Sequence, residues 1–206
     1  MDKNKELLGL EKEMAGTALP LDTNLVFGEG NVNAAIMFIG EAPGRDEDIQ
    51  RRPFVGRGGQ LLRSCLRDAG FKEEEVYITN IVKRRPPENR DPLPEEIQAY
   101  KPYLARQIGI ISPSVIVTLG RFAMNYFVPT AKITRDQGTI FRVGGRCIVP
   151  MLHPAAALRS PEMMRTFRAT FAKLPKIVEK CEAVLKENPP VAKAKPKPAA
   201  RAQKLL

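Results

Sequence analysis

The chain has 206 residues, of which 43% are hydrophobic and 27% charged, and this balance is ordinary for a soluble globular protein with one substantial core. Its formal net charge of +10 favours a polyanionic partner such as nucleic acid. Three separated cysteines without a CxxC pair exclude a disulfide framework, and no apolar run approaches the ~20 residues of a membrane-spanning helix. We therefore expect a cytoplasmic protein with no membrane partner.

Four short apolar segments, rich in β-branched residues and bounded by turn residues, predict buried strands at 34–39, 76–79, 115–119 and 147–151. Helical patterns occur at 59–69, 94–110 and 120–127, and Ser160 opens a long final helix that runs to about residue 185. The stretch 142–146 predicts a hairpin turn that places 139–141 antiparallel to the fourth strand. This alternation predicts an α/β fold, a three-layer αβα sandwich around a mainly parallel four-stranded sheet.

The composition changes after Glu187. Residues 188–206 contain five lysines or arginines and no acid, together with several prolines and alanines. Such a composition predicts a basic disordered tail that either scans phosphates or serves as a solubilising end. We therefore expect one domain over residues 1–187 and a tail over 188–206.

Several polar groups follow the predicted strands directly. The segment 40–44 (GEAPG) follows the first strand, Asn80 follows the second, and His153, the single histidine of the chain, follows the fourth. Ligands of open parallel sheets bind beyond the carboxyl ends of the strands. We therefore expect these groups to converge in one active site.

Each of these residues has a chemical and a plainer interpretation. Glu41 can orient a water molecule or be an exposed turn acid, and Phe54 can stack on a flat base or belong to the core. The Asn80 carboxamide can distinguish uracil from cytosine or cap a turn. His153 can donate a hydrogen bond to a departing base or be a solvated loop side chain. Gly40 and Gly44 allow a close backbone approach to a ligand.

Longer motifs in a fixed order resemble the family 4 uracil-DNA glycosylases over about residues 26–171. They are VFGEGN, MFIGEAPGRDED, RPFVGRGGQLL, VYITNIVKRRPPENRDP, VIVTLGRFA and MLHPAAALR. The resemblance implies two catalytic residues, Glu41 beside the attacking water and His153 at uracil O2. It also implies a base pocket that is lined by Gly40, Glu41, Ala42, Pro43, Glu47, Phe54, Asn80 and His153.

Individual roles follow from the same resemblance. Phe54 stacks on uracil, Asn80 reads its edge, and Glu47 crowds the C5 carbon so that thymine is disfavoured. The loop 154–159 resembles the wedge that fills the space left by the extruded nucleotide. Leu158 and Arg159 are the expected wedge residues, whereas Arg57, Lys83 and Arg85 are expected to contact phosphate because of their positive charge.

One feature departs from the family. Its typical members hold a [4Fe–4S] cluster with four cysteines, and the corresponding positions here are Glu13, Gly16, Arg84 and Lys101. Thiolates cannot hold a cluster there, so we expect no metal. We expect that an ion pair of Glu13 with Arg84 or Lys101, or ordinary packing, replaces it.

The sequence thus predicts a monomeric hydrolase of N-glycosyl bonds that flips deoxyuridine out of DNA, releases uracil and leaves an abasic site for base excision repair, without a cofactor. The alternative is a non-catalytic nucleic-acid-binding module derived from such an enzyme. A nucleotide hydrolase or phosphotransferase is disfavoured because the sequence has no GxxxxGK[ST] loop.

Overall fold

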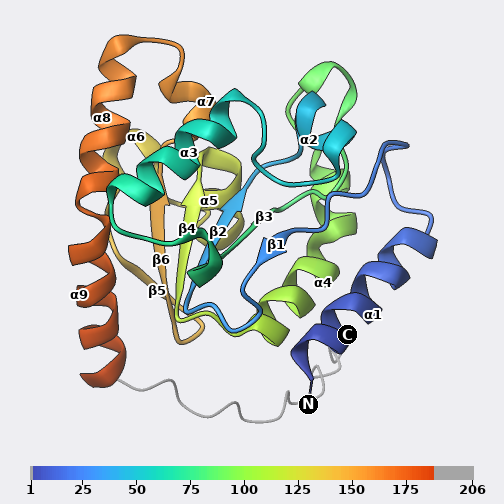
Figure 1. Cartoon of the computed structure of the whole chain (residues 1–206), viewed down its shortest axis with the longest axis horizontal. Helices are drawn as coiled ribbons and strands as arrows, with labels where there is room; N and C mark the ends of the chain where they lie inside the picture. Colours follow the sequence, from blue (N-terminus) through green and yellow to red (C-terminus); the bar gives the residue numbers. More distant parts are fainter. Residues whose placement is uncertain (1, 188–206) are drawn as a thin grey trace, which may run out of the picture.

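A six-stranded sheet forms the centre of the protein in a computed structural model that describes residues 2–187 (Figure 1). The strand order is β1-β3-β2-β4-β6-β5. The four inner strands pair in parallel, and they are β2 (Ile36–Gly40), β3 (Val76–Asn80), β4 (Val115–Leu119) and β6 (Arg146–Met151). Nearly all of their residues are buried, as expected where helices cover both faces of a parallel sheet.

The two edge strands run antiparallel to their neighbours. β5 (Phe141–Val143) pairs with β6 through a turn at Gly144 and Gly145, whose φ values are 57° and 79°. These left-handed values explain the two glycines, and the predicted hairpin is confirmed with its strand shifted by two residues. β1 (Glu29–Gly30) pairs with β3 and was not predicted, since two residues are too few to show a period. The predicted four-stranded parallel sheet is therefore the inner part of a six-stranded one.

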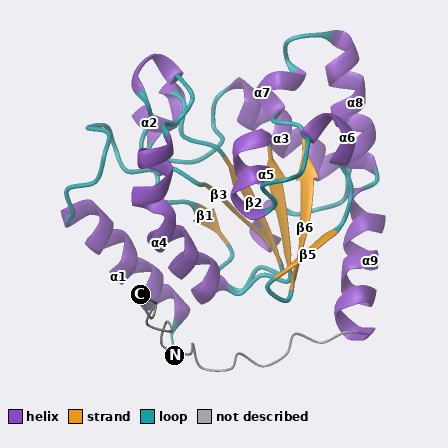
Figure 2. Ribbon diagram, turned by 180° about the vertical axis from the view of Figure 1, so that it is seen from behind, coloured by secondary structure: helices purple, strands orange, loops and turns teal. Residues whose placement is uncertain are grey.

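Two helical layers cover the sheet and confirm the three-layer sandwich (Figures 1 and 2). The helices packed on one face are α1 (Lys3–Gly16), α4 (Pro94–Ile111) and α5 (Arg121–Phe127). Those packed on the other face are α3 (Arg57–Asp68), α8 (Pro161–Ala172) and α9 (Leu174–Glu187). Side chains at helical spacing fill each interface, for example Leu62 and Leu66 of α3, which are completely buried.

The predicted long final helix is wrong, because the structure has two helices there. α8 ends at Ala172, and α9 begins at Leu174. Pro175 in the first turn of α9 has no N–H to donate, and its ring disfavours a continuous helix through this point. The break lets both helices bury residues against the same face of the sheet, including Phe171 and Val178.

The predicted basic tail, 188–206, lies outside the described residues. Within residues 2–187, no helix is long and apolar enough to cross a membrane.

The carboxyl ends of the four parallel strands lie together at one end of the sheet, which we call the carboxyl edge. The short helices α2 (Arg45–Gln50) and α7 (Pro154–Ala157) belong to the segments that leave β2 and β6 at this edge (Figure 1). Three further short helical pieces occur in other connections of the described residues, namely α6 (Ile133–Asp136) and two 3-10 turns, Glu73–Glu75 and Pro87–Asn89. This edge is where the sequence predicts the site.

Candidate active site

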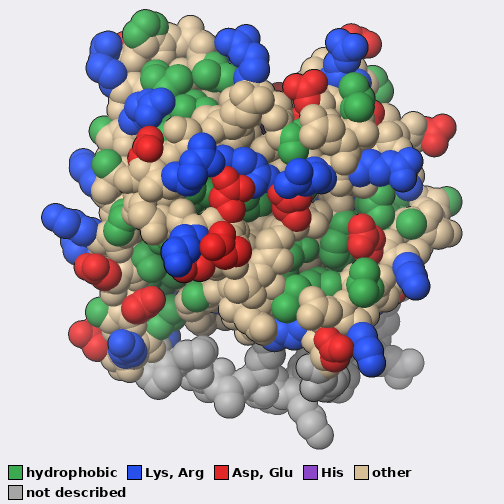
Figure 3. Space-filling model, viewed as in Figure 1, with side chains coloured by type: hydrophobic (Ala, Val, Ile, Leu, Met, Phe, Trp, Pro, Cys, Tyr) green, Lys and Arg blue, Asp and Glu red, His purple; other side chains and the backbone are tan. Residues whose placement is uncertain are grey.

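A cavity of about 840 Å³ opens at the carboxyl edge of the sheet. Its lining includes Glu41, Phe54, Asn80 and His153, which come from four separate segments of the chain. Lysine and arginine side chains, interspersed with acids, form a band across the face shown in Figure 3. The predicted convergence of these groups is therefore present in the fold.

Phe54 forms an aromatic wall of the cavity and packs against Gly40. A Cβ at Gly40 would overlap both Phe54 Cζ and Asn80 Oδ1, so only glycine admits this arrangement. Gly40 lies behind the ring rather than on the open cavity, whereas Ala42 and Pro43 of the same loop line it. The backbone N–H of Ile81 donates to Gly40 O at 2.9 Å, which ties the loop to the end of β3.

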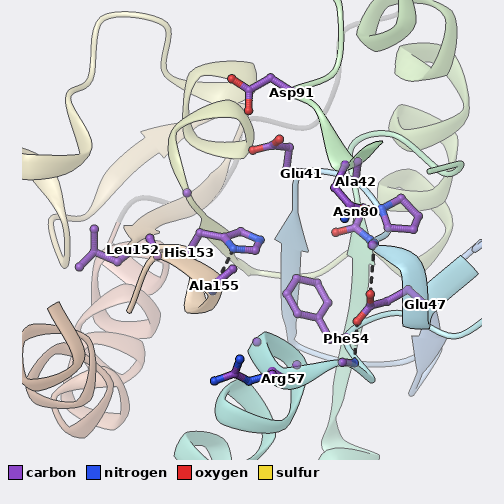
Figure 4. Close-up of a pocket in the computed structure, with 18 of the residues that line it drawn as sticks. Glu41, Ala42, Glu47, Phe54, Arg57, Asn80, Asp91, Leu152, His153 and Ala155 are labelled. Atoms are coloured by element: carbon purple, nitrogen blue, oxygen red, sulfur yellow. Dashed lines mark hydrogen bonds between the residues drawn. The ribbon is translucent and has the colours of Figure 1, made fainter. Parts of the chain in front are cut away.

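Asn80 is the last residue of β3 and is 1% exposed. Its Oδ1 accepts no hydrogen bond from any residue in the described part of the chain. A buried carbonyl oxygen without a donor costs about 1–3 kcal/mol, which a ligand N–H can recover. Figure 4 shows this carboxamide between Ala42 and Phe54, at the side of the cavity. The alternative of a turn cap is not supported, since a cap would use this oxygen.

His153 is the N-cap residue just before α7, and its ring faces the same cavity (Figure 4). Its ring centroid lies 6.0 Å from that of Phe54, with the planes tilted by 34°. The backbone N–H of Ala155 donates to His153 Nδ1 at 3.2 Å, so the proton of a neutral ring is on Nε2. Burial lowers the pKa of His153 to about 4, and the charge of Arg159 acts in the same direction. At neutral pH the imidazole is therefore an uncharged donor.

Glu41 follows the last residue of β2 and is half-buried. Burial, and to a smaller extent the charge of Asp91, raise the pKa of its carboxyl group to about 7, while the charge of Arg121 opposes the rise. Arg121 forms an ion pair with Asp91, and Figure 4 shows the Asp91 carboxyl group close to that of Glu41. Glu41 can thus gain or lose a proton near neutral pH, which suits acid–base work.

Glu47 lies in α2 and uses both carboxylate oxygens on backbone N–H groups. Oε2 accepts from Gly44 N at 3.1 Å, and Oε1 accepts from Val55 N at 2.9 Å and Gly56 N at 2.8 Å. The side chain therefore links the GEAPG loop to the segment that carries Phe54. It also lines the cavity, so it forms a rigid part of the wall.

Four of the five predicted DNA contacts lie at the surface. Arg57 and Arg159 are exposed and line the cavity. Leu158, just after α7, has 38% of its surface exposed, so its side chain is accessible to DNA as the wedge assignment requires. Arg85 is half-buried, and its Nε donates to Asn89 Oδ1 at 2.7 Å.

The prediction that Lys83 contacts phosphate is wrong. Its side chain is completely buried, and Nζ donates to Thr79 Oγ1 and to Gln107 Oε1. Burial lowers the pKa of Lys83 well below its usual range. In the sequence Lys83 stands next to Arg84 and Arg85, which suggests a surface position. In the fold its side chain points into the core near the end of β3.

Sequence reasoning missed three residues of this site. Asp91 and Arg121 line the cavity beside Glu41, although they stand within the motifs VYITNIVKRRPPENRDP and VIVTLGRFA. Gly120 has a φ of 89°, and a Cβ there would lie 3.0 Å from His153 Cβ. The signal for Gly120 was its place directly after the third predicted strand, at the same sheet edge as the other candidates.

The family's iron–sulfur cluster does not fit this chain. Glu13, Gly16, Arg84 and Lys101 occupy the four positions and provide no thiolate. The three cysteines are buried in the core on the face of the sheet covered by α3, α8 and α9, opposite to α1 and α4, and they are Cys65, Cys147 and Cys181. Among residues 2–187, no group of three histidines, cysteines or acids is arranged to hold a metal ion.

The expected ion pair at these positions is also wrong. Glu13 pairs with Arg106 of α4 at 2.6 Å instead of with Arg84 or Lys101. Arg84 donates to a backbone carbonyl, and Lys101 Nζ lies 5.9 Å from the Tyr126 ring. Ordinary packing of α1 on α4, together with the Glu13–Arg106 pair, connects the helices here.

Comparison with known proteins gives consistent matches. A family model described as the uracil DNA glycosylase superfamily matches residues 27–178. A Type-4 uracil-DNA glycosylase of Archaeoglobus fulgidus is 42% identical over 172 residues, which cover 79% of this chain and 86% of the relative. One of Thermotoga maritima is 49% identical over 150 residues, which cover 70% and 78%. One of Sulfurisphaera tokodaii is 44% identical over 164 residues, which cover 74% of each.

Proposed function

Because the chain belongs to the uracil DNA glycosylase superfamily, we propose that it releases uracil from DNA by hydrolysing the N-glycosidic bond of deoxyuridine. The observation that carries this proposal is the buried Asn80 Oδ1, which has no donor within residues 2–187 and lies in the cavity wall near the Phe54 ring, with the neutral imidazole of His153 on the other side of that ring. A flat heterocycle with an N–H beside a carbonyl fits this set of groups. Uracil presents that edge with N3–H and O4.

Recognition follows from the acceptor and the donor that the Asn80 carboxamide presents side by side. Uracil N3–H donates to Oδ1, and uracil O4 accepts from Nδ2 of the same group. Cytosine presents an unprotonated N3 to Oδ1 and an amino group to Nδ2, so both contacts become repulsive. Phe54 supplies the stacking face, and Glu47 forms the rigid wall that we assign to exclusion of the thymine methyl group.

Chemistry requires charge stabilisation at both ends of the breaking bond. As C1′–N1 breaks, the bonding electron pair moves to the uracil ring, and the Nε2–H of His153 donates to the developing charge on O2. The Glu41 carboxylate stabilises the positive sugar and accepts a proton from the water that adds to C1′. The products are uracil, which takes up a proton, and an abasic site.

The DNA must present the base outside its helix. We assign phosphate contacts to Arg57 and Arg85, and we assign the space of the extruded nucleotide to Leu158 and Arg159. Unpairing costs a few kcal/mol and costs least for a mismatched uracil, so pocket contacts with the base must offset it. We further propose that the protein acts as a monomer in the cytoplasm, where its three buried cysteines remain reduced.

Uracil release from a labelled oligonucleotide, followed by alkaline cleavage, tests the function. Wild-type protein should cleave the uracil strand and leave thymine and cytosine strands intact. His153→Ala should slow single-turnover release by about 10²-fold, because it removes one donor to the departing base. DNA binding without uracil release would instead favour the non-catalytic module.

A further inference from the structure

The backbone of Phe54, the residue whose ring forms a wall of the cavity, is strained. Its φ is 54°, in the left-handed region that an aromatic side chain rarely adopts, and the residue is only 5% exposed. Such a conformation persists only where the surrounding contacts over-determine it, and it is typical of functional sites. The contacts that hold Phe54 therefore decide where the stacking ring lies.

Arg63 of α3 contacts this segment from below the cavity. Its Nε donates to Phe54 O at 3.0 Å, and its Nη2 donates to Pro53 O at 3.1 Å. Glu47 holds the next two backbone N–H groups, those of Val55 and Gly56, from the other side. The peptide groups on both sides of the strained residue are therefore bound by charged side chains.

Arg63 is itself held by two carboxylates. Nη2 also pairs with Glu29 of β1, and Nη1 pairs with Glu73, while only 14% of the arginine side chain is exposed. Hydrogen bonds to a half-buried guanidinium are stronger than those at the open surface, and its planar fork fixes several partners at once. The side chain of Arg63 thus connects the outer strand β1 to the backbone of Phe54.

Space for this arrangement is provided by Gly59, in the first turn of the same helix. A Cβ at Gly59 would overlap the backbone of Phe54. Arg63 lies one turn further along α3, so the helix and the Phe54 segment are in direct contact at both positions. Arg63 does not line the cavity, and any effect on a bound base must therefore pass through Phe54.

We propose that Arg63 is a positioning residue for base recognition, which holds the Phe54 backbone so that the ring presents its face to uracil. This inference rests on the proposed function. Stacking acts on the bound base before and during bond cleavage, so a displaced ring weakens binding more than it slows the chemical step. If the ion pairs of Arg63 only stabilised the fold, their loss would change neither uracil binding nor the rate of the chemical step.

The test compares Arg63→Met, Arg63→Lys and Arg67→Met. Arg67 lies one turn further along α3, is exposed, and pairs with the same Glu73 at 2.9 Å without contacting the Phe54 segment. It is therefore a matched control for loss of an ion pair. Lysine keeps the charge at 63, but its compact ammonium cannot reproduce the fork.

Two measurements report on the ring, namely the half-saturating concentration in single-turnover uracil release and the affinity for free uracil by equilibrium dialysis. Arg63→Met should weaken both by about tenfold with a similar maximal rate, since base stacking contributes about that factor. Arg63→Lys should be intermediate, and Arg67→Met should match wild type. Should the methionine variant not fold, Arg63→Lys decides by the same two measurements.

A double-mutant cycle with Phe54→Ala shows whether the effect passes through the ring. Without the ring, Arg63→Met should add less than a twofold change. Wild-type uracil affinity in Arg63→Met, an equal loss in Arg67→Met, or an undiminished loss in the Phe54→Ala background would each overturn the inference. Uracil binding is measured without DNA, so an inactive wild-type enzyme would refute the proposed function alone.

Discussion

The raised pKa of Glu41 predicts a steep loss of uracil-release activity below neutral pH. Burial and Asp91 raise the pKa of this carboxyl group to about 7, and our mechanism requires its ionised form. At pH 5.5, which is 1.5 units below that value, roughly one Glu41 in thirty is ionised. Uracil release under single-turnover conditions should therefore be about thirtyfold slower at pH 5.5 than at pH 8.

Substitutions at two residues beside Glu41 should shift the pH at which activity is lost, in opposite directions. Asp91→Asn removes a negative charge that raises the pKa of Glu41, so the activity loss should begin at a lower pH. Arg121→Gln removes a positive charge that lowers it, so the loss should begin at a higher pH. His153 titrates outside this range, since its pKa lies near 4.

The assay follows release from a uracil oligonucleotide at saturating enzyme and constant ionic strength, between pH 5 and 9. Constant salt matters because phosphate contacts weaken as salt rises. Glu41→Gln provides the control, since it has no group to titrate there and should show a low, flat profile. A flat wild-type profile, or shifts of both neighbouring variants in one direction, would refute the assignment of Glu41 as the ionised catalytic group.

Three further substitutions test the geometry of the pocket and its rim. Gly40→Ala should slow uracil release by about 10²-fold while the protein stays folded by circular dichroism, because the new Cβ displaces Phe54 and Asn80. Asn80→Asp should slow uracil release by about 10²-fold and reduce the preference for uracil over cytosine, measured on paired oligonucleotides; an unchanged ratio would contradict the carboxamide assignment. Lys83→Met should leave the salt dependence of DNA binding unchanged, whereas Arg57→Gln should reduce its slope by about one; the opposite result would place Lys83 at the phosphates.

The sheet and the main site residues were predictable for a simple reason. Buried parallel strands are short apolar runs, and the residues at their carboxyl ends lie at the same end of the sheet, so the sequence already predicts that Glu41, Asn80 and His153 meet there. Their convergence depends only on strand order and direction. The break at Lys173 was missed because an amphipathic pattern continues across it.

Roles that depend on where a side chain points were not predictable in the same way. Lys83 stands in a run of basic residues, yet the end of β3 directs it into the core. Glu47 stands in an acidic turn, yet its carboxylate accepts from backbone groups on two segments. Both outcomes depend on contacts between residues distant in the chain, which local composition does not report.

The amino-acid order alone determined the fold class, the placement of three reactive groups at one sheet edge, and the absence of thiolates at the family's cluster positions. Only the tertiary structure decided that Asn80 Oδ1 is buried without a donor from residues 2–187, that Glu41 has a pKa near neutrality, and that Arg63 holds the strained Phe54. Periodicity and motif order are properties of neighbouring residues. Burial, proton affinity and backbone strain instead result from what distant segments place around each group.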